Sequence, residues 1–329
     1  WTPGEFARVG GPGVLLWSYG RSGSSFFSTA WQRASKAEFC NCQKESWNPR
    51  WWDDTPPGFT GKLKPLRFNL GGLQDCMKRG ERFMHVKPEH VLGKNTPMNH
   101  TYDKQPSYWV DHPGAFRTPK DFFHGCAVAG FSVVIASFRT DLLEIDLSSM
   151  KLECTVIHPS RDPEACVTKK AKDWFCGTTS LTADWDARIQ LWLDGVRAAE
   201  EEGLHVVHTR FEEIITDVCK VMQRVHGFLS EDAFACDLGH VPKNQVKRYD
   251  FPVSRKDLIG AEAEKCLLQH IAAADEPEKY RWMLNGSDPP AQYANWLEMP
   301  SPPLQSSYPR EEPRMVKSHC SSPQTKWTP

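Results

Sequence analysis

The sequence predicts an α/β fold in which a central parallel sheet is flanked by helices. Two short apolar runs, GVLLWSY at residues 13–19 and FSVVIASF at residues 131–138, have the length and composition of buried central strands. A helical pattern follows each run. Strands that alternate with helices favour a parallel sheet with helical crossovers.

The other elements follow from hydrophobic spacing and from helix stop signals. The clearest helix covers residues 184–202, because Trp185, Ile189 and Trp192 recur at helical spacing and Gly203 stands at a C-cap position. In full, we predict strands at residues 13–19, 83–86, 131–138 and 204–208, and helices at residues 26–36, 141–150, 184–202, 211–228, 257–274 and 276–284.

The remaining stretches lack such periodicity. Residues 40–75 are rich in Trp, Pro, Asn and Gly, and residues 93–121 are similarly irregular, so both are predicted to be mostly loops. Residues 287–329 are rich in Pro and Ser and are predicted to be a disordered tail. We therefore expect one folded domain over residues 1–286.

Charge and cysteine content narrow the class of protein. Lys plus Arg (40) nearly balances Asp plus Glu (41), which argues against a nucleic-acid partner. Cys154, Cys166 and Cys176 fall in one polar stretch, which suits either a disulfide-stapled loop or reduced, buried thiols. Glycosylation sequons at Asn99 and Asn285 favour the lumen of the secretory pathway. No apolar run is long enough to span a membrane, so an anchor is expected only upstream of these residues.

A Gly/Ser loop follows the first strand. Residues 20–25, GRSGSS, lie between a buried strand and a helix, where backbone N–H groups and the helix N-terminus favour anions. Arg21 adds a permanent positive charge. This arrangement predicts a P-loop-type three-layer fold. The loop lacks the Gly-Lys-[Ser/Thr] ending of nucleotide triphosphatases, so no metal is expected.

Two segments carry a resemblance to a known family. WSYGRSGSSF at residues 17–26 resembles the 5′-phosphosulfate loop of sulfotransferases that use 3′-phosphoadenosine 5′-phosphosulfate (PAPS). VVIASFRTDLLEIDLSS at residues 133–149 resembles the family's 3′-phosphate segment, a strand ending in Arg and then a helix carrying Ser. Many members place that Ser eight residues after the Arg, where this chain has Leu147; Ser148 is our choice and Ser149 the reserve. The residues that this resemblance assigns to the donor are Arg21, Ser22, Gly23, Ser24, Ser25, Phe26, Arg139 and Ser148.

The resemblance also implies catalytic residues. KESW at residues 44–47 is similar to the segment of heparan-type and chondroitin-type sulfotransferases whose Glu is the base, which implies Glu45. DKQPSYW at residues 103–109 is similar to the segment whose Lys faces the transferred group, which implies Lys104, although Asp103 and Gln105 depart from the pattern. Arg21 and Lys104 would neutralise charge on the leaving phosphate. His90 is the rival base, because Lys87 and His90 are similar to the Lys-x-His of cytosolic members, one residue wider.

The expected function is transfer of a sulfuryl group from PAPS to a hydroxyl or amine of a carbohydrate, in the Golgi lumen. A cytoplasmic enzyme that sulfates small molecules with a His base is the first alternative. A P-loop kinase and a non-catalytic binding protein on the same scaffold are the others.

Overall fold

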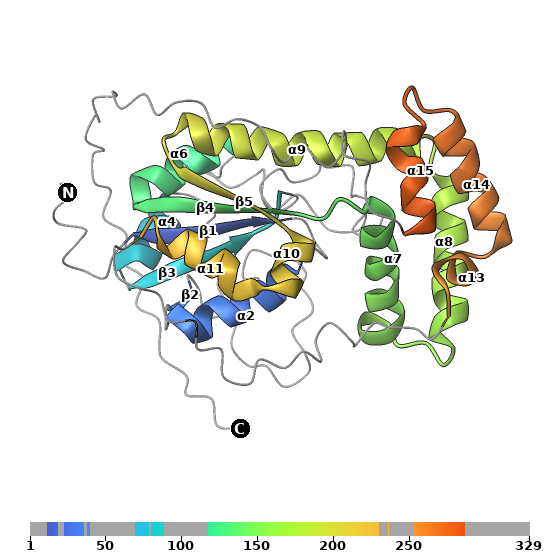
Figure 1. The fold of residues 1–329 in the computed structure, drawn as a ribbon, viewed down its shortest axis with the longest axis horizontal. Helices are drawn as coiled ribbons and strands as arrows, with labels where there is room; N and C mark the ends of the chain where they lie inside the picture. Colours follow the sequence, from blue (N-terminus) through green and yellow to red (C-terminus); the bar gives the residue numbers. More distant parts are fainter. Residues whose placement is uncertain are drawn as a thin grey trace.

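A five-stranded parallel sheet forms the centre of the protein (Figure 1). The computed structural model describes residues 12–18, 23–35, 38–39, 70–78, 80–88, 118–229, 236 and 253–286. The strands are β1 (Gly13–Ser18), β2 (Glu38–Phe39), β3 (Glu81–Val86), β4 (Phe131–Phe138) and β5 (His205–Arg210), and their order in the sheet is β2-β3-β1-β4-β5. The predicted α/β architecture with a central parallel sheet is confirmed.

Helices surround this sheet and begin at recognisable signals. The helical segments are α2 (Ser24–Ser35), α4 (Leu70–Lys78), α6 (Pro119–Ala129), α7 (Leu142–Leu152), the π-helical turn η2 (Glu153–Ile157), α8 (Pro163–Gly177), α9 (Leu181–Glu201), α10 (Phe211–Thr216), α11 (Val218–His226), α13 (Arg255–Ile259), α14 (Ala261–Ala272) and α15 (Glu278–Asn285). Thr118, Asp141 and Asp162 cap α6, α7 and α8, each side chain accepting a hydrogen bond from a backbone N–H three residues later.

Alternate residues of each central strand enter two separate cores. Leu15 and Trp17 of β1 belong to the core that contains aromatic residues of α6 and α9. Val14 and Leu16 face the other core, which α2 and α11 cover. Trp17 donates a hydrogen bond to the carbonyl of Trp192 at 3.2 Å. The sheet is therefore covered on both faces, which explains why every residue of β1 is buried.

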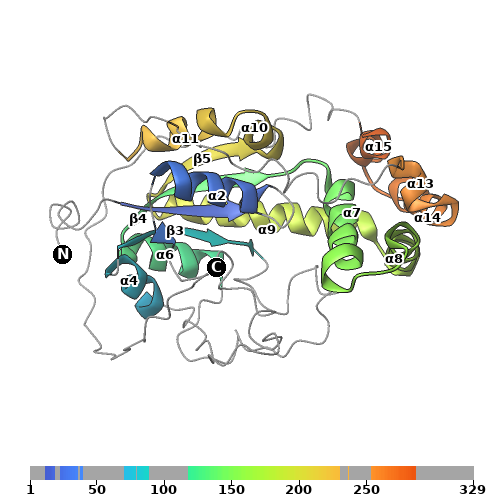
Figure 2. The same cartoon turned by 90° about the horizontal axis from the view of Figure 1, so that it is seen from below.

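A group of helices extends beyond the carboxyl ends of the strands. Figures 1 and 2 show α7, α8, α13, α14 and α15 together on this side of the molecule. Disulfides join Cys154 to Cys166 and Cys176 to Cys266, so η2 is linked to α8, and α8 to α14. We call these helices, with η2, the helical layer.

Several predicted boundaries differ from the structure. Residues 163–177, for which no helix was predicted, form α8, and α4 begins inside the stretch predicted to be loop. The helix predicted over residues 211–228 is interrupted at Asp217, and the one over residues 257–274 at Gly260. The tail predicted over residues 287–329 lies outside the described residues.

Candidate functional site

The strand order places a topological switch point at the carboxyl ends of β1 and β4. These two strands are neighbours, with Ser18 opposite Ser137 at their ends. The chain leaves β1 toward β2 on one side of the sheet and leaves β4 toward β5 on the other. In open parallel sheets, ligands bind where successive connections diverge in this way. The residues that follow β1 and β4 are therefore the candidate site.

Gly23 and Ser24 form the described part of the loop after β1. The carbonyl of Gly23 accepts a hydrogen bond from the N–H of Phe27 at 2.9 Å, so α2 starts directly at the sheet edge. Gly23 has φ of 74°, a conformation that favours glycine. Ser24 is buried, and Phe26 packs against the core under α2. The first N–H groups of α2 are thus available to an anion at this edge.

Arg139 follows β4 and is largely buried. Its guanidinium carbon lies 4.2 Å from the centre of the Phe211 ring, and its Nη2 lies 4.0 Å from Oε1 of Glu144. Burial lowers the pKa of Arg139, an effect that the charges of Glu144 and Asp141 oppose, and the group stays charged at neutral pH. A buried, charged guanidinium at the end of a central strand is suited to bind an anionic oxygen.

Phe211 connects the two loops. This first residue of α10 follows β5, and a Cβ atom added at Gly23 would lie 3.0 Å from its ring. The same ring stacks on Arg139. The residues after β1, β4 and β5 therefore meet around one aromatic side chain. Phe211 was not singled out in the sequence analysis, although its place at the start of the predicted helix that follows the strand at residues 204–208 was a usable signal.

Ser148 and Arg139 meet at Glu144. The hydroxyl of Ser148 donates to Oε1 of Glu144 at 3.1 Å, the same carboxylate oxygen that faces Arg139. Ser149, the reserve residue, instead donates to the carbonyl of Ile145 within the helix. Leu147, at the position where many members of the family that this segment resembles have Ser, is buried in the core. The structure thus brings Ser148, and not Ser149, to the carboxylate beside Arg139.

Arg255 of α13 joins this cluster from the helical layer. Its Nη2 lies 2.7 Å from Oδ2 of Asp141 and 3.1 Å from Oε2 of Glu144, and its Nη1 donates to the carbonyl of Met283. Burial raises the pKa of Asp141, and the charge of Arg255 opposes that rise. Arg255 was not singled out as a site residue in the sequence analysis. We call Arg139, Asp141, Glu144, Ser148, Lys151 and Arg255 the β4–α7 cluster.

A buried carboxylate anchors the helix that carries the cluster. Asp146 of α7 accepts hydrogen bonds from Nε1 of Trp185 at 2.9 Å and from Arg188 at 2.5 Å, both on α9. Asp141 caps the same helix by accepting from the N–H of Glu144 at 2.9 Å. Asp141 thus fixes the start of α7, and Asp146 fixes the same helix against α9. The side chains of Glu144 and Ser148 are therefore positioned before a ligand binds.

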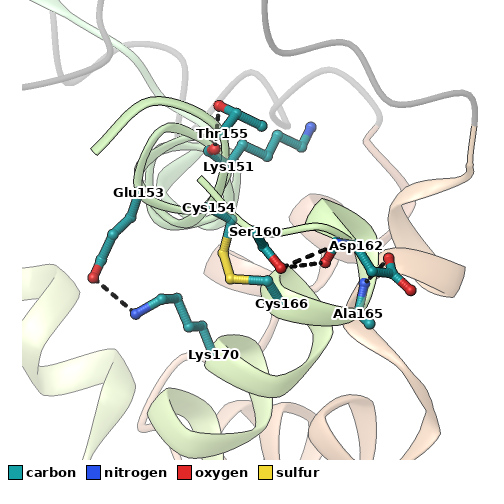
Figure 3. The surroundings of a disulfide bond; sticks show 9 residues. All are labelled: Lys151, Glu153, Cys154, Thr155, Ser160, Asp162, Ala165, Cys166 and Lys170. Carbon is teal, nitrogen blue, oxygen red and sulfur yellow. Dashed lines mark hydrogen bonds and ion pairs between the residues drawn. A yellow bond between two sulfur atoms is a disulfide. The ribbon is translucent and has the colours of Figure 1, made fainter. Parts of the chain in front are cut away.

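The helical layer fixes Arg255 through a chain of contacts. Figure 3 shows Cys154 bonded to Cys166, with Glu153 and Lys170 paired at 2.8 Å across the same two helices. Further along α8, Thr168 donates to the carbonyl of Leu258 on α13 at 2.8 Å. α13 is thereby held against α8, with Arg255 directed at the start of α7.

The other predicted site residues lie outside the described residues. This applies to Arg21, Ser22, Glu45, His90 and Lys104, and to the side chain of Ser25. His85, which precedes His90 in the same segment, is described: it is buried, and its Nε2 lies 3.0 Å from Oγ of Ser18. The structure therefore brings together Gly23, Arg139 and Ser148, the predicted donor-site residues that surround Phe211 and Glu144.

Comparisons with known proteins do not identify a relative. Neither a scan against protein-family models nor a search of curated proteins finds a match to this chain. Within the described ranges, no helix has both the length and the apolar character needed to cross a bilayer. Three disulfides join described cysteines, Cys154 to Cys166, Cys176 to Cys266 and Cys219 to Cys236, and they fit an oxidising, secretory or lumenal environment.

Proposed function

We propose that the protein is a sulfotransferase that moves a sulfuryl group from PAPS to a hydroxyl or amine of a carbohydrate. The observation that carries this proposal is the meeting of Gly23, at the start of α2, with Arg139, at the end of β4, around Phe211. A donor with a 5′-phosphosulfate and a 3′-phosphate needs two anion sites a nucleotide's width apart. The start of α2 and Arg139 are the candidates for these two sites.

The proposed roles of the donor-site residues follow from their chemistry. Arg21, Ser22, Ser24, Ser25 and the N–H groups at the start of α2 bind the 5′-phosphosulfate, and Phe26 packs the helix beneath it. Arg139 and Ser148 bind the 3′-phosphate. A strand, a Gly/Ser loop and a helix in this order support a P-loop-type fold whose loop works without Mg²⁺.

The proposed reaction is an in-line displacement at sulfur. The acceptor oxygen forms a new bond to sulfur while the bond between sulfur and the 5′-phosphate oxygen breaks, and 3′-phosphoadenosine 5′-phosphate leaves. Glu45 takes the acceptor proton, with His90 as the alternative base. Arg21 and Lys104 neutralise the charge that develops on the leaving phosphate, as in phosphoryl transfer.

The disulfides support a site of action in the secretory pathway. An enzyme that depends on three such bonds needs an oxidising compartment, and carbohydrate acceptors are abundant in the Golgi lumen. We therefore place the proposed activity in that compartment.

Calorimetric titration of the purified chain tests the proposal. We expect 3′-phosphoadenosine 5′-phosphate to bind in the presence of EDTA, and adenosine diphosphate with Mg²⁺ to bind much more weakly. Binding of adenosine diphosphate only with Mg²⁺ would contradict the proposal and favour a kinase. Donor binding without sulfate transfer to any of a panel of glycans would favour a binding protein on the same scaffold.

A further inference from the structure

Several hydrogen-bond donors of the β4–α7 cluster converge on a single carboxylate, that of Glu144. Ser148 donates to it at 3.1 Å and Arg255 contacts it at 3.1 Å. Lys151 lies 3.6 Å and Arg139 lies 4.0 Å from the same group. Only 16% of the Glu144 side chain is exposed, so these interactions are shielded from solvent.

A carboxylate and a phosphate compete for such donors. A serine hydroxyl has one proton to donate, so Ser148 cannot donate to Glu144 and to a phosphate oxygen at the same time. The negative charge of Glu144 would also lie within a few ångströms of a phosphate held by Arg139 and Ser148. Any phosphate that engages both residues must therefore displace Glu144 from Ser148.

The cluster contains a place for the displaced carboxylate. Arg255 contacts Oε2 of Glu144 and Lys151 lies near Oε1, and neither contact requires Ser148. Glu144 can thus keep two cationic partners while it gives up the hydroxyl. A ligand with two negative charges gains enough from Arg139 to drive this exchange more readily than a ligand with one.

We propose that Glu144 is an internal competitor for the anion site formed by Arg139 and Ser148. It lowers the affinity of that site and restricts it to highly charged groups such as a phosphomonoester. This inference rests on the proposed function, because that function assigns the 3′-phosphate of the donor to Arg139 and Ser148.

The test compares two nucleotides on three forms of the full chain: the wild type, Glu144→Gln, and the control Glu202→Gln. Gln keeps the size of Glu144 and one acceptor oxygen, but it removes the charge and replaces the other oxygen by an NH2 donor. Glu202 also has a partly buried carboxylate with a basic partner, His124, but it lies at the end of α9, outside the cluster and outside the contacts that hold Arg255. Affinities are measured by calorimetry for 3′-phosphoadenosine 5′-phosphate and for adenosine 5′-monophosphate, which lacks the 3′-phosphate.

We expect Glu144→Gln to tighten binding of 3′-phosphoadenosine 5′-phosphate by about tenfold or more, because the repulsion of a nearby unit charge is removed. Binding of adenosine 5′-monophosphate should not change, and Glu202→Gln should match the wild type for both nucleotides. Glu144→Ala, which leaves more room beside Ser148, should change the affinities in the same direction.

The two proposals fail in different ways. If the wild type binds 3′-phosphoadenosine 5′-phosphate but both Glu144 variants bind it equally or more weakly, Glu144 organises the site and does not compete, and the inference is overturned. An equal gain for both nucleotides would also overturn it, because the effect would not depend on the 3′-phosphate. If the wild type binds neither nucleotide, the proposed function falls, and this inference falls with it.

Discussion

Arg139 combines three properties that a phosphate-binding residue needs. It follows a central strand, its side chain is largely shielded from solvent, and its guanidinium is stacked on Phe211. The stacking fixes the orientation of the guanidinium plane, which reduces the entropy lost when a ligand binds.

We predict that Arg139→Ala weakens binding of 3′-phosphoadenosine 5′-phosphate by about 10- to 100-fold, the usual effect of losing a charge-assisted hydrogen bond. Calorimetry with the variant measures this loss, and thermal unfolding checks that the variant is folded. Arg161→Ala, at an exposed position before α8, is the control. An unchanged affinity in Arg139→Ala would remove this residue from the site.

The identity of the base is a second question at the scale of single residues. We predict that Glu45→Gln lowers the rate of sulfate transfer by about 10²- to 10⁴-fold, because the acceptor proton loses its carboxylate. Affinity for 3′-phosphoadenosine 5′-phosphate should stay unchanged, since the base faces the acceptor. Radiolabelled sulfate transfer at saturating donor gives the rate. If Glu45→Gln remains active and His90→Ala is inactive, the base is His90.

At the scale of secondary-structure elements, two disulfides are expected to stabilise the helical layer to different extents. Cys176 and Cys266 are 90 residues apart in sequence, and their bond ties α8 to α14, next to the helix that carries Arg255. Cys154 and Cys166 are only 12 residues apart. Because closing a longer loop restricts the unfolded chain more, the first bond is expected to contribute more stability.

We predict that the double variant Cys176→Ser/Cys266→Ser lowers the free energy of unfolding by about 2–4 kcal/mol. It should also weaken binding of 3′-phosphoadenosine 5′-phosphate, because Arg255 loses support. Cys154→Ser/Cys166→Ser should cost less stability. Urea unfolding and calorimetry measure the two effects. If the Cys176/Cys266 variant loses stability but binds the nucleotide as the wild type does, the position of Arg255 does not depend on this bond.

Strands and helices were predictable where the local sequence determines them. They were missed where contacts between residues distant in sequence determine them. The run at β1 is short and mainly apolar, and the run at β4 contains three consecutive β-branched residues, Val133, Val134 and Ile135, so the sequence alone identified both as central strands. α8 was missed although Val167, Ala171 and Phe175 recur every four residues, because polar residues dominate the rest of the segment. The break at Gly260 depends on tertiary packing: φ there is 79°, and a Cβ atom would lie 2.9 Å from Thr168.

The residues of the candidate site fall into the same two groups, those that the local sequence identifies and those that only the fold brings together. Gly23, Arg139 and Ser148 belong to short motifs, so their types and spacing could be recognised in the sequence. Arg255 could not, because its partner Asp141 is 114 residues away and only the folded helical layer brings them together. Glu144 has an ordinary place in the first turn of a helix, and its role depends on the donors that surround it.

For the whole molecule, the β4–α7 cluster joins two parts that are otherwise distinct. Arg139 follows the central sheet, whereas Arg255 belongs to the helical layer, and both face Glu144. A ligand that binds at this junction stabilises both parts at once, provided that it binds the folded chain alone.

We therefore predict that 3′-phosphoadenosine 5′-phosphate raises the melting temperature as one cooperative transition. At a concentration of 100 times its dissociation constant, the stabilisation is about 2.7 kcal/mol, which corresponds to roughly 5–10 °C for a domain of this size. Differential scanning calorimetry measures the shift, and Arg139→Ala at the same concentration should show about half of it or less. Two transitions, of which the nucleotide moves only one, would show that the sheet and the helical layer unfold separately. In that case the contacts of Arg255 with Asp141 and Glu144 would be too weak to couple the two parts, and binding at the cluster would stabilise only the part that holds Arg139.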